Sequence, residues 1–265
     1  MAKMRHRLQD DQCRLCLREH VKLQDSHFLP KGLYKRLRDE SQKNPNPVLV
    51  TKNTVVQTSE QMSEYLLCGE CEQRLNRNGE RWILGNCLQG DGSFPLETTL
   101  TCHPPDISSL TSATRVYFAS RYPDINVDAI AYFAASIFWR GSIHPWSEDG
   151  EKPVRFGPIQ ERFRQYLLGV EPFPHEASLS VVVRTNGKTD RITYGPSGKR
   201  KKDIRHFRFT MPGLVFLLFC GPDLPENIRN ASMVHNDSCP ISIAPMLEER
   251  ILDEIRPLFI GKQLK

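Results

Sequence analysis

Residues 13–16, CRLC, and residues 68–71, CGEC, decide the fold of the first third of this chain. Fifty-one residues separate the two pairs. Two CxxC pairs far apart in sequence are typical of a tetrahedral site in which four thiolates bind Zn²⁺. We expect this zinc to be structural, because a Cys₄ site leaves no position open for a substrate. Its ligands would be Cys13, Cys16, Cys68 and Cys71.

The composition is that of a folded protein. Of the 265 residues, 39% are hydrophobic and 25% are charged, so a buried core can form. The sequence has no run of eighteen apolar residues, so we expect no membrane span. Residues 1–13 are polar and basic, unlike a secretory signal, so we expect the protein in the cytoplasm. In that reducing compartment the paired cysteine spacing favours metal over disulfides.

The remaining sequence predicts an α+β fold: a zinc module followed by a helix and an antiparallel sheet. We expect the module at 1–84, a linker at 85–112 and an accessory domain at 113–265 that binds nucleic acid or a partner. The linker is rich in Gly, Pro, Ser and Thr. Asp124 or Asn126 would cap a buried helix at 124–140. Asn186-Gly187 predicts a hairpin between strands at 178–184 and 189–194.

Other elements follow from hydrophobic periodicity. Helices are expected at 31–40, after the second cysteine pair (72–76), at 157–168 and at 247–258. Strands are expected at 21–24, 48–50, 55–56, 204–210 and 214–220.

His27 is the first candidate for chemistry. It follows the short strand that leaves the first cysteine pair, and Pro30 ends that segment. A neutral imidazole near pH 7 can take a proton from water, the task of a general base. The alternative is an ordinary surface or core histidine.

Glu72 and Asn76 are the second candidates. Their i, i+4 spacing places them on one helix face, and Glu80 lies one turn further if the helix continues past Gly79. Oxygen ligands of this kind suit Mg²⁺ or Mn²⁺. The alternative is a solvated helix face.

The order CRLC, DSHFLPKGLY and YLLCGECEQRLNRNGE resembles the HNH endonuclease superfamily of zinc-containing treble-clef (ββα-metal) nucleases. It is most similar to bacterial members found near mobile elements or phage-defence genes. The resemblance implies that His27 is the general base and that Glu72 stands where many members carry a His or Asn metal ligand. The family's middle Asn has no clear counterpart, since Ser63 and Glu64 occupy its neighbourhood. A role in phage defence and a partner protein encoded nearby would follow from the resemblance.

A basic segment at 195–202 is the third candidate. Lys199, Arg200, Lys201 and Lys202 would grip phosphates as part of a loop. The alternative is a solvated hairpin loop, favoured by the lack of an aromatic stacking surface in that segment.

The leading hypothesis is therefore a metal-dependent HNH-type endonuclease that hydrolyses DNA phosphodiesters. It would use structural Zn²⁺ and catalytic Mg²⁺ or Mn²⁺. The alternative is a non-catalytic zinc treble-clef module that binds nucleic acid or a protein, because treble clefs serve both purposes. The net charge of +5 argues against a DNA-mimicking inhibitor.

Overall fold

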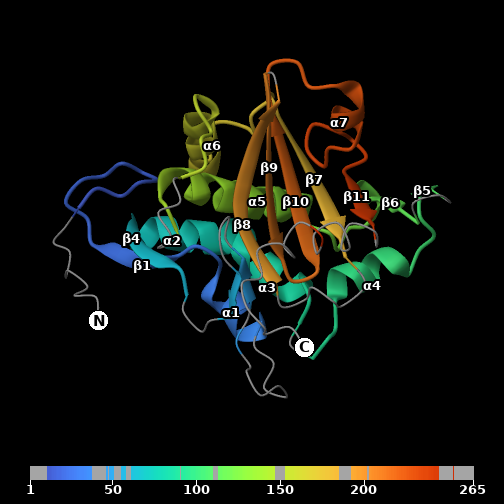
Figure 1. Cartoon of the computed structure of the whole chain (residues 1–265), viewed down its shortest axis with the longest axis horizontal. Helices are drawn as coiled ribbons and strands as arrows, with labels where there is room; N and C mark the ends of the chain where they lie inside the picture. The colour runs from blue at the N-terminus through green and yellow to red at the C-terminus, as the bar shows by residue number, and fades with distance from the viewer. Residues whose placement is uncertain are drawn as a thin grey trace.

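The computed structural model has a mixed α and β architecture, as predicted. Figure 1 shows strands and helices throughout the chain, with β1 (Leu23–His27), β4 (Ser63–Cys68) and α2 (Gly69–Leu75) at one side of a large sheet. The structure describes residues 11–37, 46, 48–50, 55–57, 61–89, 91–109, 113–146, 153–184, 192–201, 203–244 and 253.

Within these residues, nine strands form one twisted sheet in the order β3-β2-β8-β9-β10-β7-β11-β6-β5. Neighbours are antiparallel except for the pairs β2–β8 and β7–β11, which are parallel. The strands are β2 (Val48–Val50), β3 (Val55–Gln57), β5 (Ile107–Ser108), β6 (Arg115–Phe118), β7 (Ala177–Val183), β8 (Ile192–Lys201), β9 (Ile204–Met211), β10 (Leu214–Cys220) and β11 (Pro240–Ile243).

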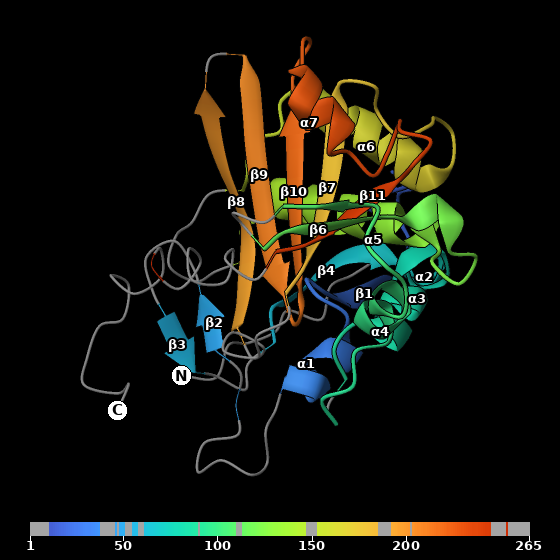
Figure 2. The ribbon, with the colours of Figure 1, turned by 90° about the vertical axis from the view of Figure 1, so that its right-hand side faces the viewer.

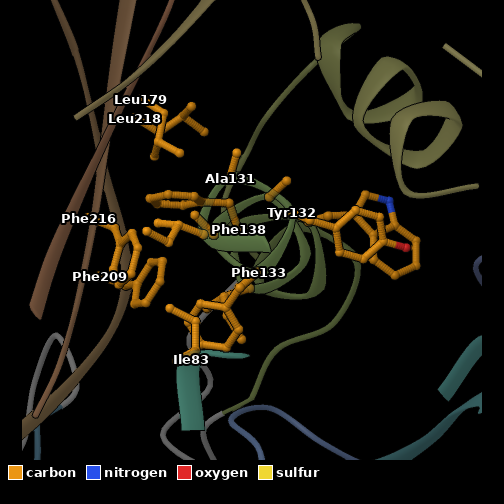
Figure 3. Close-up of a cluster of buried hydrophobic side chains, with 14 of the residues drawn as sticks. Ile83, Ala131, Tyr132, Phe133, Phe138, Leu179, Phe209, Phe216 and Leu218 are labelled. Carbon is orange, nitrogen blue, oxygen red and sulfur yellow. The ribbon is translucent and has the colours of Figure 1, made fainter. Parts of the chain in front are cut away.

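Helix α5 (Val127–Ile143) forms the centre of the core. Asn126 caps it, since its side chain accepts a hydrogen bond from the Ala129 amide at 2.9 Å, which confirms one of the two predicted caps. Figures 1 and 2 show α5 crossing one face of the sheet. In Figure 3 the rings of Phe133 and Phe138 point from α5 toward Phe209 and Phe216 of β9 and β10. The helix is buried nearly all round, because η1 (Asn76–Glu80), α3 (Arg81–Asn86) and α6 (Ile159–Leu168) also pack against it.

The part of the chain that holds the second cysteine pair and His27 forms a two-stranded antiparallel sheet and a helical segment. Strands β1 (Leu23–His27) and β4 (Ser63–Cys68) pair with each other, and α2 (Gly69–Leu75) begins directly after β4. The helical segment continues through the π-helical turn η1 (Asn76–Glu80) into α3 (Arg81–Asn86). Helix α1 (Lys31–Leu37) follows β1.

The remaining described elements are α4 (Pro95–Thr101), the 3₁₀ turn η2 (Ala119–Arg121), α6 (Ile159–Leu168) and α7 (Glu226–Asn230). Among them, α6 packs against α5, α4 against α3 and η2 against β11. Helix α6 ends at Gly169, whose φ of 74° suits a residue without a Cβ atom.

Two local predictions are wrong. Strand β7 does not form a hairpin with β8, because β9 and β10 lie between them in the sheet. Residues 195–201 are part of strand β8 rather than a loop, and they pair with β9. The Gly195-Pro196 step interrupts the register, as expected where proline supplies no amide hydrogen to the ladder.

The division into domains stays a prediction, and three observations bear on it. The expected linker contains α4 and β5. Strands β2 and β3 come from the expected zinc module yet extend the large sheet through β8. One buried cluster of hydrophobic side chains contains residues from both expected domains. The expected helix at 247–258 lies outside the described residues, apart from Asp253.

Candidate metal centre and adjoining polar cavity

The four cysteines of the two CxxC pairs come together. Their sulfur atoms all lie within 4.8 Å of one another, and those of Cys16 and Cys68 are 3.9 Å apart. Four thiolates around one Zn²⁺ at 2.3 Å would have sulfurs about 3.8 Å apart. The cluster can therefore bind a metal ion such as zinc, as the sequence predicted.

The local chain path forms this cluster at the junction of three segments. Cys13 and Cys16 lie on a tight turn in which Leu17 adopts a φ of 59°. Cys68 ends β4 and Cys71 lies in the first turn of α2. The Cys68 amide donates to Cys13 Sγ at 3.3 Å, so backbone dipoles also favour negative charge on sulfur.

Arg18 supplies a positive charge beside the sulfurs. Its Nε and Nη2 donate to Cys16 Sγ and Cys68 Sγ at 3.4 and 3.5 Å, and it forms an ion pair with Glu70 at 2.6 Å. These interactions, first the one with Cys16, raise the pKa of Arg18. The guanidinium offsets part of the negative charge of four thiolates.

The thiols of Cys13 and Cys71 form a hydrogen bond with each other. A hydrogen bond from Cys71 lowers the pKa of Cys13 to about 4, and the same contact raises the pKa of Cys71. A bound metal ion would displace the protons that remain on these thiols.

A polar cavity of about 340 Å³ lies beside this cluster, between the end of β1 and the helical segment α2–η1–α3. It is lined by all four residues that the sequence singled out for catalysis, His27, Glu72, Asn76 and Glu80. Glu72 and Asn76, which we expected on one helix face, both line this cavity.

His27 is held by one ring nitrogen. Its Nδ1 lies 3.1 Å from the backbone oxygen of Asp25. A carbonyl oxygen can only accept, so Nδ1 carries the hydrogen in this contact and Nε2 of the neutral ring has a lone pair. No described residue forms a hydrogen bond with Nε2. The half-buried imidazole can therefore accept a proton on the cavity side.

Tyr34 lies next to His27, with ring centroids 6.4 Å apart. Burial raises the pKa of Tyr34 to about 12. Its phenol stays protonated near neutral pH and does not compete with the imidazole as a base.

Glu72 has a buried carboxylate oxygen whose hydrogen-bonding capacity is unmet by the described residues. Its Oε1 is buried and has no hydrogen-bond partner among the described residues. A buried carboxylate oxygen without a donor is costly, so it calls for a hydrogen-bond donor or a cation. The oxygens of Glu72 and of the Asn76 side chain on the same cavity are of the class that a hard divalent cation prefers.

Glu80 differs from Glu72, because it is already neutralised. Its Oε1 lies 2.6 Å from Nη2 of Arg140, which reaches the cavity from α5. The helix does continue past Gly79, but through a π-helical turn, and Glu80 is buried. An ion-paired carboxylate is a weaker candidate for a metal ligand than Glu72.

No family model, curated protein or solved structure matches this chain. The resemblance to HNH nucleases therefore stays a prediction that stands on the quoted motifs and on this geometry.

Two positively charged side chains that line the cavity were not predicted from the sequence. Arg140 is a charged residue in the buried, mainly apolar part of α5, and that contrast was the available signal. Lys31 follows Pro30 directly after the His27 segment and is exposed at the cavity. An exposed ammonium there can attract a phosphate group.

The basic cluster lies on the sheet and does not line this cavity. Lys199 and Arg200 are exposed on β8 opposite His206 and Arg205 of β9. Lys201 is the last residue of β8, and Lys202 lies outside the described residues.

Within the described residues, no helix combines the length and apolar character needed to cross a membrane.

Proposed function

We propose that this protein is a metal-dependent endonuclease of the HNH type that hydrolyses DNA phosphodiester bonds. One observation carries the proposal: a ring nitrogen of His27 and a buried oxygen of Glu72 have no hydrogen-bond partner among the described residues, and both side chains line the same cavity. The order of elements also supports it, since a CxxC turn, two antiparallel strands and a helix with a second CxxC pair are what a ββα-metal module requires.

In this proposal His27 is the general base. Its Nδ1–H bond to the Asp25 carbonyl fixes the ring, and Nε2 takes a proton from the attacking water. Such a base contributes about 10²–10⁴-fold to the rate.

Glu72 and Asn76 hold Mg²⁺ or Mn²⁺. When bound, the ion stabilises the negative charge that develops on the phosphate and on the leaving oxygen. Mg²⁺ commonly takes one or two carboxylates and completes its shell with waters and substrate phosphate, so two protein ligands are sufficient. Glu72 is adjacent to Cys71, so a structural zinc in the cysteine cluster would fix the start of α2 and with it the metal ligand.

A second candidate function is a zinc-bound module that binds DNA or a partner without cleaving it. The ion pair of Glu80 with Arg140 favours it, because that pair removes one negative charge from the cavity. Ser63 and Glu64, in place of the family's middle Asn, also favour it.

A plasmid-nicking assay with Mg²⁺ or Mn²⁺ separates the two functions. We compare the zinc-loaded wild type with His27→Ala, and with His103→Ala as the matched control, because His103 is exposed and lies outside the cavity. We expect His27→Ala to nick at least about 100-fold more slowly and His103→Ala to match the wild type. Equal nicking rates of the wild type and His27→Ala would refute the role of His27 as general base. No nicking by either protein would favour the binding module.

A further inference from the structure

We propose that Arg140 is a positioning residue that sets the place of His27, and that the candidate nuclease site is therefore completed by helix α5 from the middle of the chain. The inference rests on the proposed function and concerns the geometry of the same site. Arg140 lies outside the segment that resembles HNH nucleases, so the resemblance does not imply it.

The contacts of Arg140 join three parts of the cavity. Nη1 donates to the backbone oxygens of His27 and Phe28 at 2.9 and 3.0 Å. Nη2 donates to Glu80 at 2.6 Å. One guanidinium thus fixes the end of β1 relative to η1.

The guanidinium of Arg140 and its partner Glu80 are both buried. The Arg140 side chain is 2% exposed and that of Glu80 is 12% exposed. A buried ion pair gives little net stability compared with apolar residues of the same size. In the buried part of α5, a guanidinium is better explained by the directions of its donors than by stability.

The geometry also needs an arginine. A planar guanidinium can donate to two carbonyls with one nitrogen while a second nitrogen reaches a carboxylate. A lysine ammonium at this position is a single point and cannot serve all three acceptors in the same directions.

The backbone of α5 at Arg140 is held by packing on two sides. Helix α5 packs Phe133 and Phe138 against the sheet on one side, and its backbone meets η1 on the other. The place of the imidazole therefore depends on how α5 is docked between the sheet and the helical segment. A mutation that shifts α5 should shift His27 without touching it.

The test uses the full chain with zinc bound. The main variant is Arg140→Met/Glu80→Gln, which removes both charges together and so avoids leaving one of them buried alone. Arg140→Lys is the second variant, because it keeps the charge and still reports if the double variant does not fold. Arg162→Met/Glu176→Gln is the matched control, since Arg162 and Glu176 form an ion pair outside the cavity.

Three readouts are needed: nicking rate at saturating DNA, the NMR signals of the His27 ring, and their broadening by Mn²⁺. We expect the double variant to retain zinc and to nick about 100-fold more slowly, the loss expected for a displacement of about 1 Å. Its half-saturating DNA concentration should be unchanged, and the His27 ring signals should move. Arg140→Lys should fall between the double variant and the wild type, and the control should match the wild type.

A folded double variant that nicks at the wild-type rate with unmoved ring signals would overturn the inference and leave the nuclease proposal standing. If the double variant does not fold, Arg140→Lys decides by the same criteria. If the wild type does not nick, the nuclease proposal fails and the ring signals still decide. Moved signals with weaker Mn²⁺ broadening would then support the positioning role, and unmoved signals would refute it.

Discussion

Gly79 in η1 lies directly against the backbone of Phe133 in α5. A Cβ atom at residue 79 would lie 2.8 Å from the Phe133 nitrogen and 2.9 Å from its Cα. Both are closer than side-chain carbons approach backbone atoms, and neither backbone can rotate away as a side chain could. The absence of a side chain at Gly79 is therefore what lets the π-helical turn dock on α5 and bring Glu80 to Arg140.

We predict that Gly79→Ala destabilises the protein, because the added methyl group forces η1 and α5 apart. Overpacking of this kind costs about 1–3 kcal/mol, a fall in melting temperature of about 2–10 °C for a chain of this size. Gly85→Ala is the matched control, since a Cβ atom at Gly85 in α3 meets nothing within 4 Å. It should raise stability by up to about 1 kcal/mol. Thermal unfolding of both variants checks this, and an equal response would contradict the close approach.

We predict that Cys71→Ser removes bound zinc and lowers the melting temperature by at least about 5 °C, because loss of a metal-linked fold costs several kcal/mol. Cys13→Ser should behave in the same way. Cys102→Ser is the control, since Cys102 is exposed and outside the cluster. Elemental analysis and thermal unfolding provide the measurements. A Cys71→Ser protein with full zinc content and unchanged melting would rule out the four-thiolate site.

We predict that Glu72→Gln weakens Mn²⁺ binding at the cavity at least about tenfold, since loss even of residues that only support a metal ligand costs 10–100-fold. Glutamine keeps the shape of the side chain and removes the charge. Glu226→Gln makes the same change in the first turn of α7, where the side chain is exposed, and should have no effect. Calorimetric titration of the zinc-loaded protein measures the affinity. Equal Mn²⁺ affinity in wild type and Glu72→Gln would exclude the glutamate as a ligand.

We predict that neutralising the basic end of β8 flattens the salt dependence of DNA binding. Each phosphate contact contributes about 0.9 to the slope of log K against log salt. Lys199→Gln/Arg200→Gln should lower that slope by up to about 2, because both side chains are exposed. Lys22→Gln/Arg229→Gln makes the same charge change at exposed residues elsewhere. A slope that is the same in wild type and the β8 variant would return this cluster to an ordinary solvated strand end.

Local patterns predicted much of the fold correctly. The spacing of the cysteines predicted the cluster, because the ligand type and the tight CxxC turn are both written in the sequence. Apolar residues in nearly every turn predicted the buried helix α5, and alternation predicted β9 and β10 closely. Each of these features depends on residues that are neighbours along the chain.

Strand neighbours were not predictable in the same way. Asn186-Gly187 suggested that β7 and β8 pair, yet β7 pairs with β10 and β11. An alternating pattern records which face of a strand is buried but not which strand lies beside it.

The sequence by itself determined the four-cysteine cluster, the buried helix and the candidate residues His27 and Glu72. Only the tertiary structure decided that Arg140, sixty residues beyond Glu80, would neutralise that glutamate and hold the carbonyls of His27 and Phe28. The reason is physical. A buried charge finds its partner through the packing of distant helices, and here that packing depends on one glycine whose missing side chain leaves no periodic signal.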